Sequence, residues 1–326
     1  MIRFRNKIFI TGLAVFPLLL SCSDSSDDFG GEVRYSDVQI IPSAHIVNAE
    51  LTRSDFEGPV NNTSFTPSSE KIFGVTAYLD FNVPTSWVKN SRIYFSPVNS
   101  DAQGNYHFEE SKYYPIDYRT YFYAFSPMVH CDFIDGNETE HPKVEYTLTG
   151  REDVMWSKNE RGFLKAKDPE FQEQPDFLFE HKLQRVNFYV KRTSSVPSDW
   201  KVTEISITNL RNKATLDLIT GDLVFDEDAP LVKMAAAKSN YSLTPTTDAY
   251  QKFEYDIMFQ PGIKSFKLNL VIGDNTFEAP VVLTGEHAGE AGYMHTLYIT
   301  IDIQTLTLSQ PVLVPWVDEL SYNTTL

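Results

Sequence analysis

Hydrophobic positions along most of this chain recur every second residue, in short runs bounded by Pro, Gly, Asn and Asp. A period of two is typical of a β-strand with one buried face, and no segment keeps a helical period over three turns. The runs lie at 72–80, 92–98, 105–110, 112–118, 120–128, 144–148, 153–158, 177–191, 202–210, 213–225, 253–259, 266–272, 276–283, 293–303 and 312–317. The pattern predicts an all-β chain, with about seven strands in each half, enough for one β-sandwich each.

Polar, turn-rich stretches divide these runs. Gln103-Gly104-Asn105, Thr220-Gly221-Asp222 and Gly273-Asp274-Asn275 predict tight turns between neighbouring strands. The polar stretch 165–176 contains two prolines and is interpreted as an interdomain linker. We therefore expect an N-terminal sandwich over 54–170 and a C-terminal sandwich over 171–326.

The segment from Tyr35 to Arg53 alternates weakly, and Pro42 interrupts it. Because proline cannot donate a hydrogen bond to a neighbouring strand, this segment is expected at the edge of a sheet. A polar stretch at 54–71, rich in Ser, Asn and Pro, follows and is expected to be an exposed, protease-accessible loop.

An apolar run at 8–22 follows the basic residues Arg3, Arg5 and Lys7, as in a secretory signal. It ends at Cys22, and the junction resembles the lipobox of bacterial lipoproteins, in which the cysteine carries lipid. We expect residues 1–21 to be a signal peptide and Cys22 to be the lipidation site. The alternative is an ordinary signal peptide that happens to contain a cysteine.

The chain has a net charge of -16 and two cysteines in 326 residues. A body this acidic repels phosphates, so nucleic acid is not an expected partner. If Cys22 carries lipid, Cys131 stands alone and no internal disulfide can form. Cys131 is then expected to be a small, buried apolar residue.

Motifs for chemistry are sparse. We find no nucleophile elbow, phosphate loop or dinucleotide fingerprint, and predict no catalytic residues, no metal site and no cofactor. His287, Glu290 and His295 are the candidates for a metal site, against the plainer interpretation of a Gly-rich turn and structural histidines. The loops at 135–138 and 226–228 carry oxygen ligands suited to calcium, but neither has the full loop pattern, so solvated acidic loops are favoured.

Aromatic residues crowd one region and could in principle stack on sugars. At alternating strand positions they are more often part of a core, which is the interpretation we favour. They are Tyr113, Tyr114, Tyr118, Tyr121, Phe122, Tyr123 and Phe125.

The order of these features resembles the fimbrillin family of Bacteroidetes, the subunits of major and minor fimbriae. The resemblance rests on the signal to Cys22, Thr52-Arg53 before a Ser-rich loop, KIFGVTAYL (71–79), YYPIDYRTYFYAFSP (113–127), DVMWSK (153–158), FLFEHKLQRVNFYV (177–190), AGYMHTLYITI (291–301) and Trp316. It implies two transthyretin-like antiparallel β-sandwich domains in tandem. It also implies a non-enzymatic pilin, exported as an outer-membrane lipoprotein and displayed in cell-surface fimbriae that support adhesion.

The resemblance implies a maturation route as well. An extracellular Arg-specific protease would cut between Arg53 and Ser54, releasing residues 22–53 as a propeptide with an edge strand; Arg34 is the rival site. Removal of an edge strand exposes a groove that another strand can fill, and a head-to-tail contact of this kind propagates a filament. The donor region would be the C-terminal run that contains Val312, Val314 and Trp316, so other fimbrial subunits are the expected partners.

Two other functions stay open on the sequence alone. One is a surface lipoprotein that does not polymerise, such as a fimbrial anchor or tip or a glycan-binding module. The other is a hydrolase, which the missing catalytic constellation disfavours.

Overall fold

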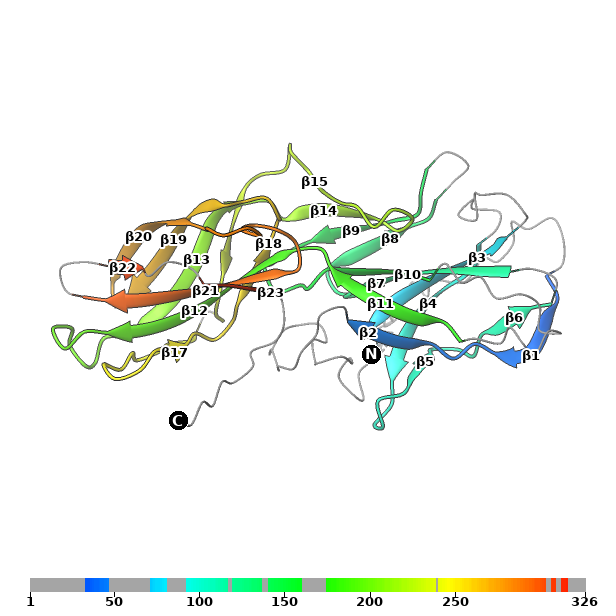
Figure 1. The fold of residues 1–326 in the computed structure, drawn as a ribbon, viewed down its shortest axis with the longest axis horizontal. Helices are drawn as coiled ribbons and strands as arrows, with labels where there is room; N and C mark the ends of the chain where they lie inside the picture. Colours follow the sequence, from blue (N-terminus) through cyan, green and yellow to red (C-terminus); the bar gives the residue numbers. More distant parts are fainter. Residues whose placement is uncertain are drawn as a thin grey trace, which may run out of the picture.

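The computed structural model describes residues 33–46, 71–80, 92–116, 119–136, 140–159, 174–238, 240–302, 306–308 and 312–315. Every regular element in these ranges is a β-strand, which confirms the all-β prediction. The molecule is elongated, with the early strands at one end and the late strands at the other (Figure 1). The predicted signal peptide, Cys22, Arg53, Ser54 and Trp316 lie outside the described residues. Within those residues no helix is long and apolar enough to cross a membrane.

Over the described residues the strands at the N-terminal end form three sheets. The largest has the order β2 (Ser43–Ile46), β11 (Asp176–His181), β10 (Met155–Asn159), β7 (Arg119–Ser126), β3 (Phe73–Asp80), β4 (Arg92–Ser100) and β5 (Tyr106–Phe108). A second consists of β15 (Leu223–Phe225), β14 (Lys213–Asp217), β9 (Lys143–Thr147) and β8 (Cys131–Ile134). A third pairs β1 (Tyr35–Gln39) with β6 (Tyr113–Pro115).

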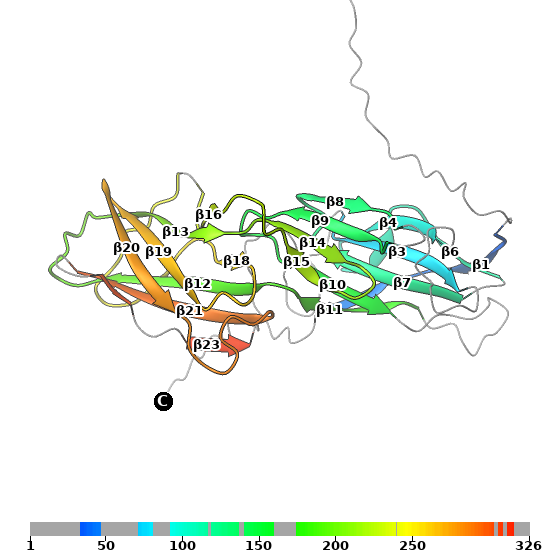
Figure 2. The same ribbon diagram turned by 90° about the horizontal axis from the view of Figure 1, so that it is seen from above.

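The described strands at the C-terminal end form two further sheets (Figure 2). One contains β17 (Gln251–Lys252), β12 (Gln184–Arg192), β21 (Tyr293–Ile301), β22 (Leu306–Leu308), β18 (Ile257–Phe259) and β23 (Val312–Pro315). The other has the order β16 (Val232–Ala235), β13 (Val202–Leu210), β19 (Ser265–Ile272) and β20 (Asn275–Val282). Val186 and Phe188 from the first sheet share a core with Ile205 and Leu268 from the second, as in a sandwich.

Strand β3 is buried on both faces, and each face belongs to a different core. Phe73 and Val75 lie in an aromatic-rich cluster with Phe177 and Phe179, which we call the N-terminal core. Tyr78, on the opposite face, joins the larger cluster that continues through the β8–β9–β14–β15 sheet to the C-terminal end. A strand buried on both faces holds its sheet firmly in place, because its side chains pack against a core on each face of the sheet.

Strand pairing crosses the boundary expected at residue 170. Strand β11 pairs with β10 and β2, and β14 pairs with β9, so strands on either side of residue 170 share sheets. The polar stretch 165–176 therefore connects paired strands of one sheet and is not a linker between separate sheets. Turn-rich composition marks a connection between strands but does not distinguish these two cases.

Two runs are split where one strand each was expected. In β11 burial alternates, with Phe177 and Phe179 buried, whereas the first five residues of β12, from Gln184 to Phe188, are all buried. The two strands belong to different sheets. Run 253–259 is likewise interrupted before β18, where the N–H of Phe253 donates to the carbonyl of Phe188 at 2.8 Å.

The three predicted turns are confirmed as connections of hairpins β4–β5, β14–β15 and β19–β20. Gly221 in the second turn has φ +76°, and a Cβ atom there would lie 2.5 Å from the Trp156 ring. The Trp156 indole N–H donates to the carbonyl of Leu218 at 2.9 Å. This turn thereby attaches the β8–β9–β14–β15 sheet to β10. Only glycine fits at position 221, because of the positive φ and the close approach of the Trp156 ring.

Candidate functional site

The N-terminal edge segment, residues 33–46, contains β1 and β2 on either side of Pro42. Strand β2 stands at one end of the strand order of its sheet, as the sequence predicts, and runs parallel to β11. Its register pairs Ala44 with Phe177 and Ile46 with Phe179. Strands that pair in parallel require a long connection, so this segment joins its sheet from a distance in sequence (Figure 1).

Alternate side chains of this edge segment point into the N-terminal core. Ile40 is 1% exposed and Ile46 is 5% exposed, and Pro42 and Ala44 between them are also buried. Ile41, by contrast, is 52% exposed. The period-two burial makes this segment one wall of the core, although it is an edge strand.

The floor against which the segment packs is aromatic. The Phe73 ring lies 5.8 Å from the Phe177 ring and 5.2 Å from the Phe179 ring, both in edge-to-face geometry. All three rings are fully buried with the segment in place. Loss of the segment would expose these rings together with the unpaired backbone edge of β11, which is the surface that an incoming strand requires.

Backbone hydrogen bonds hold the segment on two sides. On the β6 side, the N–H of Ile40 donates to the carbonyl of Lys112 at 2.8 Å, and the N–H of Ile116 donates to the carbonyl of Arg34 at 2.9 Å. On the β11 side, the N–H of Ser43 donates to the carbonyl of Pro175 at 2.8 Å. The segment therefore bridges two sheets.

Side chains of Gln174 and Asp176 reinforce the segment around Pro42, and we call these two residues the clasp. The Gln174 amide accepts from the N–H of Ile41 at 2.7 Å and donates to the carbonyl of Gln39 at 3.1 Å. One Asp176 oxygen accepts from the Ser43 hydroxyl at 2.7 Å and lies 3.2 Å from Nε2 of His45. The clasp replaces the ladder bonds that Pro42 interrupts. Gln174 lay in the stretch interpreted as a linker, so no sequence signal singled it out.

The predicted donor region lies at the edge of a sheet in its own chain. Strand β23, with Val312 and Val314, pairs antiparallel with residues 293–296 of β21, and β22 pairs with residues 299–301 further along the same strand. On its other side β21 pairs with β12. The C-terminal strands thus form the outer margin of the C-terminal sheet, and among the described residues both pair with β21.

The candidate metal residues are not brought together as a ligand set. Nδ1 of His287 lies 2.9 Å from Oε2 of Glu290 within the turn, and its ring stacks on Tyr293. His295 is fully buried on β21, where Nε2 accepts from the N–H of Gly289 at 3.3 Å. Burial lowers the pKa of His295 to about 4, so the ring is neutral at physiological pH. No cluster of three ligating side chains occurs among the residues that the structure describes.

Most members of the aromatic cluster are core residues, as predicted. Tyr114, Phe122, Tyr123 and Phe125 are buried, whereas Tyr113 is 39% exposed. Tyr118 lies outside the described residues.

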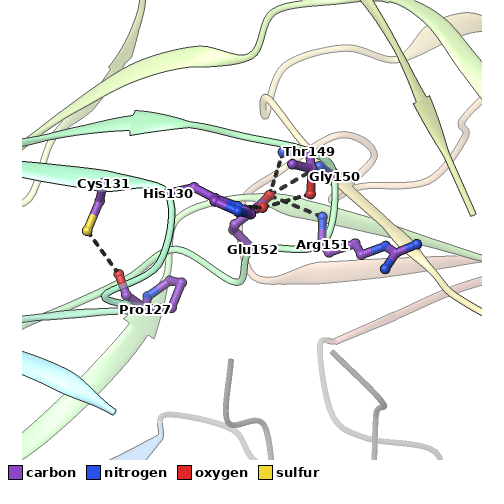
Figure 3. Close-up of polar contacts among 7 residues, drawn as sticks. All are labelled: Pro127, His130, Cys131, Thr149, Gly150, Arg151 and Glu152. Carbon is purple, nitrogen blue, oxygen red and sulfur yellow. Dashed lines mark hydrogen bonds and ion pairs between the residues drawn. The ribbon is translucent and has the colours of Figure 1, made fainter. Parts of the chain in front are cut away.

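Cys131 is partly buried, and its Sγ atom lies 3.8 Å from the carbonyl of Pro127 (Figure 3). Burial, assisted by the Asp132 carboxylate, raises the pKa of the thiol to about 12. The thiol stays protonated at neutral pH and is a poor nucleophile.

A buried carboxylate not anticipated from the sequence organises the connection between β9 and β10 (Figure 3). Glu152 is fully buried, and its Oε2 accepts from the N–H groups of Thr149 at 2.6 Å and of Gly150 and Arg151 at 3.2 Å each. Its Oε1 accepts from the Thr149 hydroxyl and from Nδ1 of His130, both at 2.7 Å. The loop thus wraps a negative charge in donors, which makes it rigid.

This arrangement predicts a pH dependence of folding. Burial acts to raise the pKa of Glu152, but the hydrogen bonds from Thr149 and His130 outweigh it, and the pKa lies below the ordinary 4.5. The stabilisation is complete above pH 4.5 and is lost as the pH falls through the folded-state pKa. Glu152→Gln should remove this dependence and cost about 2 kcal/mol at pH 7, because an amide cannot accept all the bonds. Denaturant unfolding of the wild type and of Glu152→Gln across pH 3–7 gives the unfolding free energy at each pH. Equal slopes of unfolding free energy against pH for the two proteins would contradict this prediction.

A family model described as fimbrillin-like matches residues 52–316 of this chain. The fold is shared with a proposed cell adhesion protein of Bacteroides ovatus, with TM-score 0.58 and 14% identity over 88% of this chain and 99% of that one. A proposed cell adhesion protein of Bacteroides uniformis gives 0.56 and 16% over 85% and 99%. A fimbrial protein of Bacteroides vulgatus gives 0.54 and 15% over 85% and 99%.

At these identities the solved structures establish a common fold. No curated protein matches the chain. The family model, however, spans well over half of the sequence and covers the described strands from β3 to β23. The chain therefore belongs to the fimbrillin-like family.

Proposed function

We propose that this protein is a structural subunit of cell-surface fimbriae, in which the N-terminal edge segment is removed and replaced by a C-terminal strand of another copy. The observation that carries the proposal is the segment itself, which fills the N-terminal core with alternate side chains while standing at the edge of its sheet. Such a segment can leave without unthreading the fold, and its place accepts another extended strand.

The same geometry supports our choice of the position of the cut. Cleavage after Arg34 would leave β1 and β2 attached to the body of the protein, whereas a cut beyond Ile46 frees them. Arg53 is the only arginine between β2 and β3 in the sequence. The family match begins at residue 52, beyond the edge segment. We therefore assign the Arg-specific cleavage to the bond between Arg53 and Ser54.

The C-terminal strands are the donor in this proposal. Strand β23 carries Val312 and Val314 at the margin of its sheet, and its exchange would break the pairing with β21 that the described residues show. A chain that offers a strand at one end and a groove at the other makes a head-to-tail contact, and that contact extends into a filament.

The membrane anchor belongs to the removable part. With a signal peptide at 1–21 and lipid on Cys22, the precursor would be tethered to the outer membrane through residues 22–53. Cleavage after Arg53 would then break the covalent connection of both the tether and the edge segment to the body of the protein. The lipid would hold the precursor at the cell surface until the segment leaves.

Treatment of the purified precursor with an Arg-specific protease tests the proposal. We expect heat-stable oligomers from the wild-type protein and none from Arg53→Ala. The matched control Arg34→Ala should polymerise as the wild type does, because the bond from the Ile116 N–H goes to the backbone carbonyl of residue 34, which the substitution keeps. Denaturing electrophoresis of unboiled samples reads the result. Oligomers from Arg53→Ala, or none from the cleaved wild type, would contradict the proposal.

A further inference from the structure

We propose that the clasp, Gln174 and Asp176, retains the N-terminal edge segment after the chain has been cut and selects it against the C-terminal strand. This inference rests on the proposed fimbrial function and concerns the timing of exchange. The clasp would make removal of the segment a step separate from cleavage.

The clasp contacts both the backbone and the side chains of the segment. Gln174 bonds the N–H of Ile41 and the carbonyl of Gln39, the two backbone groups just before the proline break. Asp176 meets a hydroxyl directly after the proline and an imidazole two residues further on. The side-chain pattern that Asp176 recognises is therefore Ser43-x-His45, directly after Pro42, at the rim of the groove.

The C-terminal strand does not carry this pattern. Between residues 306 and 316 the prolines are Pro311 and Pro315. The residues next to them are Gln, Val and Trp, so no serine adjoins a proline on either side. No histidine occurs after His295. A strand from this region that entered the groove would offer Asp176 neither a hydroxyl directly after a proline nor an imidazole two residues further on, so Asp176 favours the segment already in place.

Cleavage at Arg53 cuts the chain outside these contacts. The buried side chains, the backbone bonds to β6 and β11 and the clasp all lie within residues 33–46 and their partners, so the cut fragment keeps every one of them. Among these contacts the clasp bonds lie at the solvent-exposed rim. They can therefore be altered without opening the core.

The experiment follows the release of the N-terminal fragment from the cleaved precursor. The fragment is separated by size exclusion and quantified by mass spectrometry over time, with excess synthetic peptide of residues 33–46 present to block rebinding. We expect release about tenfold faster from Gln174→Ala, which loses two hydrogen bonds, and about fivefold faster from Asp176→Ala. Gln103→Ala, in the exposed β4–β5 turn, and Asp199→Ala are matched controls that should release at the wild-type rate. Unchanged melting temperatures of the uncut variants establish that they are folded.

The outcomes separate the two proposals. If both clasp variants release the fragment at a rate within twofold of the wild-type rate, the clasp proposal is wrong. The same holds if none of the proteins releases the fragment. If the clasp variants release the fragment faster but no cleaved protein polymerises, the clasp stands and the proposed function fails. If cleaved proteins polymerise while release rates are equal, the function stands and the clasp fails.

Discussion

A chain that begins at Ser54 should be less stable than one that begins at residue 33 by about 5 kcal/mol. The estimate counts mainly Ile40 and Ile46, which are 1% and 5% exposed and each contribute about 2–3 kcal/mol when buried. Pro42 and Ala44 add smaller terms. The truncated chain should also associate, because it presents an unpaired edge beside exposed phenylalanine rings.

Denaturant unfolding and light scattering measure these two effects. The matched control is the chain that begins at residue 33, which lacks the same signal and tether but keeps the edge segment. Addition of a synthetic peptide of residues 33–46 should restore part of the lost stability in proportion to its concentration. Equal unfolding free energies for the two chains would show that the segment is not a wall of the core.

A second large effect is expected at the buried ion pair between Arg185 and Asp256. Both side chains are almost fully buried, at 3% and 2% exposure, and Nε of Arg185 donates to the carboxylate at 2.6 Å. Asp256→Ala would leave the guanidinium without its partner in a site closed to water. Because an uncompensated buried charge is strongly unfavourable, we expect a loss of about 3–5 kcal/mol.

Urea unfolding of Asp256→Ala measures this loss, with the exposed Asp199→Ala as a control that should change stability by less than about 0.5 kcal/mol. The double variant Arg185→Met/Asp256→Leu should recover most of the loss, since it removes both charges. A single variant within about 1 kcal/mol of the wild type would contradict the account of this pair.

The sequence predicts local features of this fold well. Alternation identifies β19 and β21 because each has a buried face, and Pro42 identifies an edge because it lacks an N–H. These signals depend on neighbours along the chain. They report that a face is buried but not what covers it.

The pairing partners and the polar contacts required the structure. Strand β2 pairs with β11 across more than a hundred residues, and nothing in either strand encodes that choice. Gln174 and Glu152 are ordinary polar residues in turn-like stretches, and their roles arise from backbone groups brought to them by the fold. The pattern at 312–317 predicts a strand, but the place of β23 on β21 depends on register at long range.

The central claim is that the groove occupied by residues 33–46 is the groove filled during polymerisation. The most direct measurement adds a synthetic peptide of residues 33–46 to the protease-cleaved precursor and follows polymer growth by electrophoresis and electron microscopy. We expect inhibition that rises with peptide concentration and disappears when the peptide carries Ile40→Asp and Ile46→Asp. Polymer growth unaffected by the native peptide at any concentration would contradict the account.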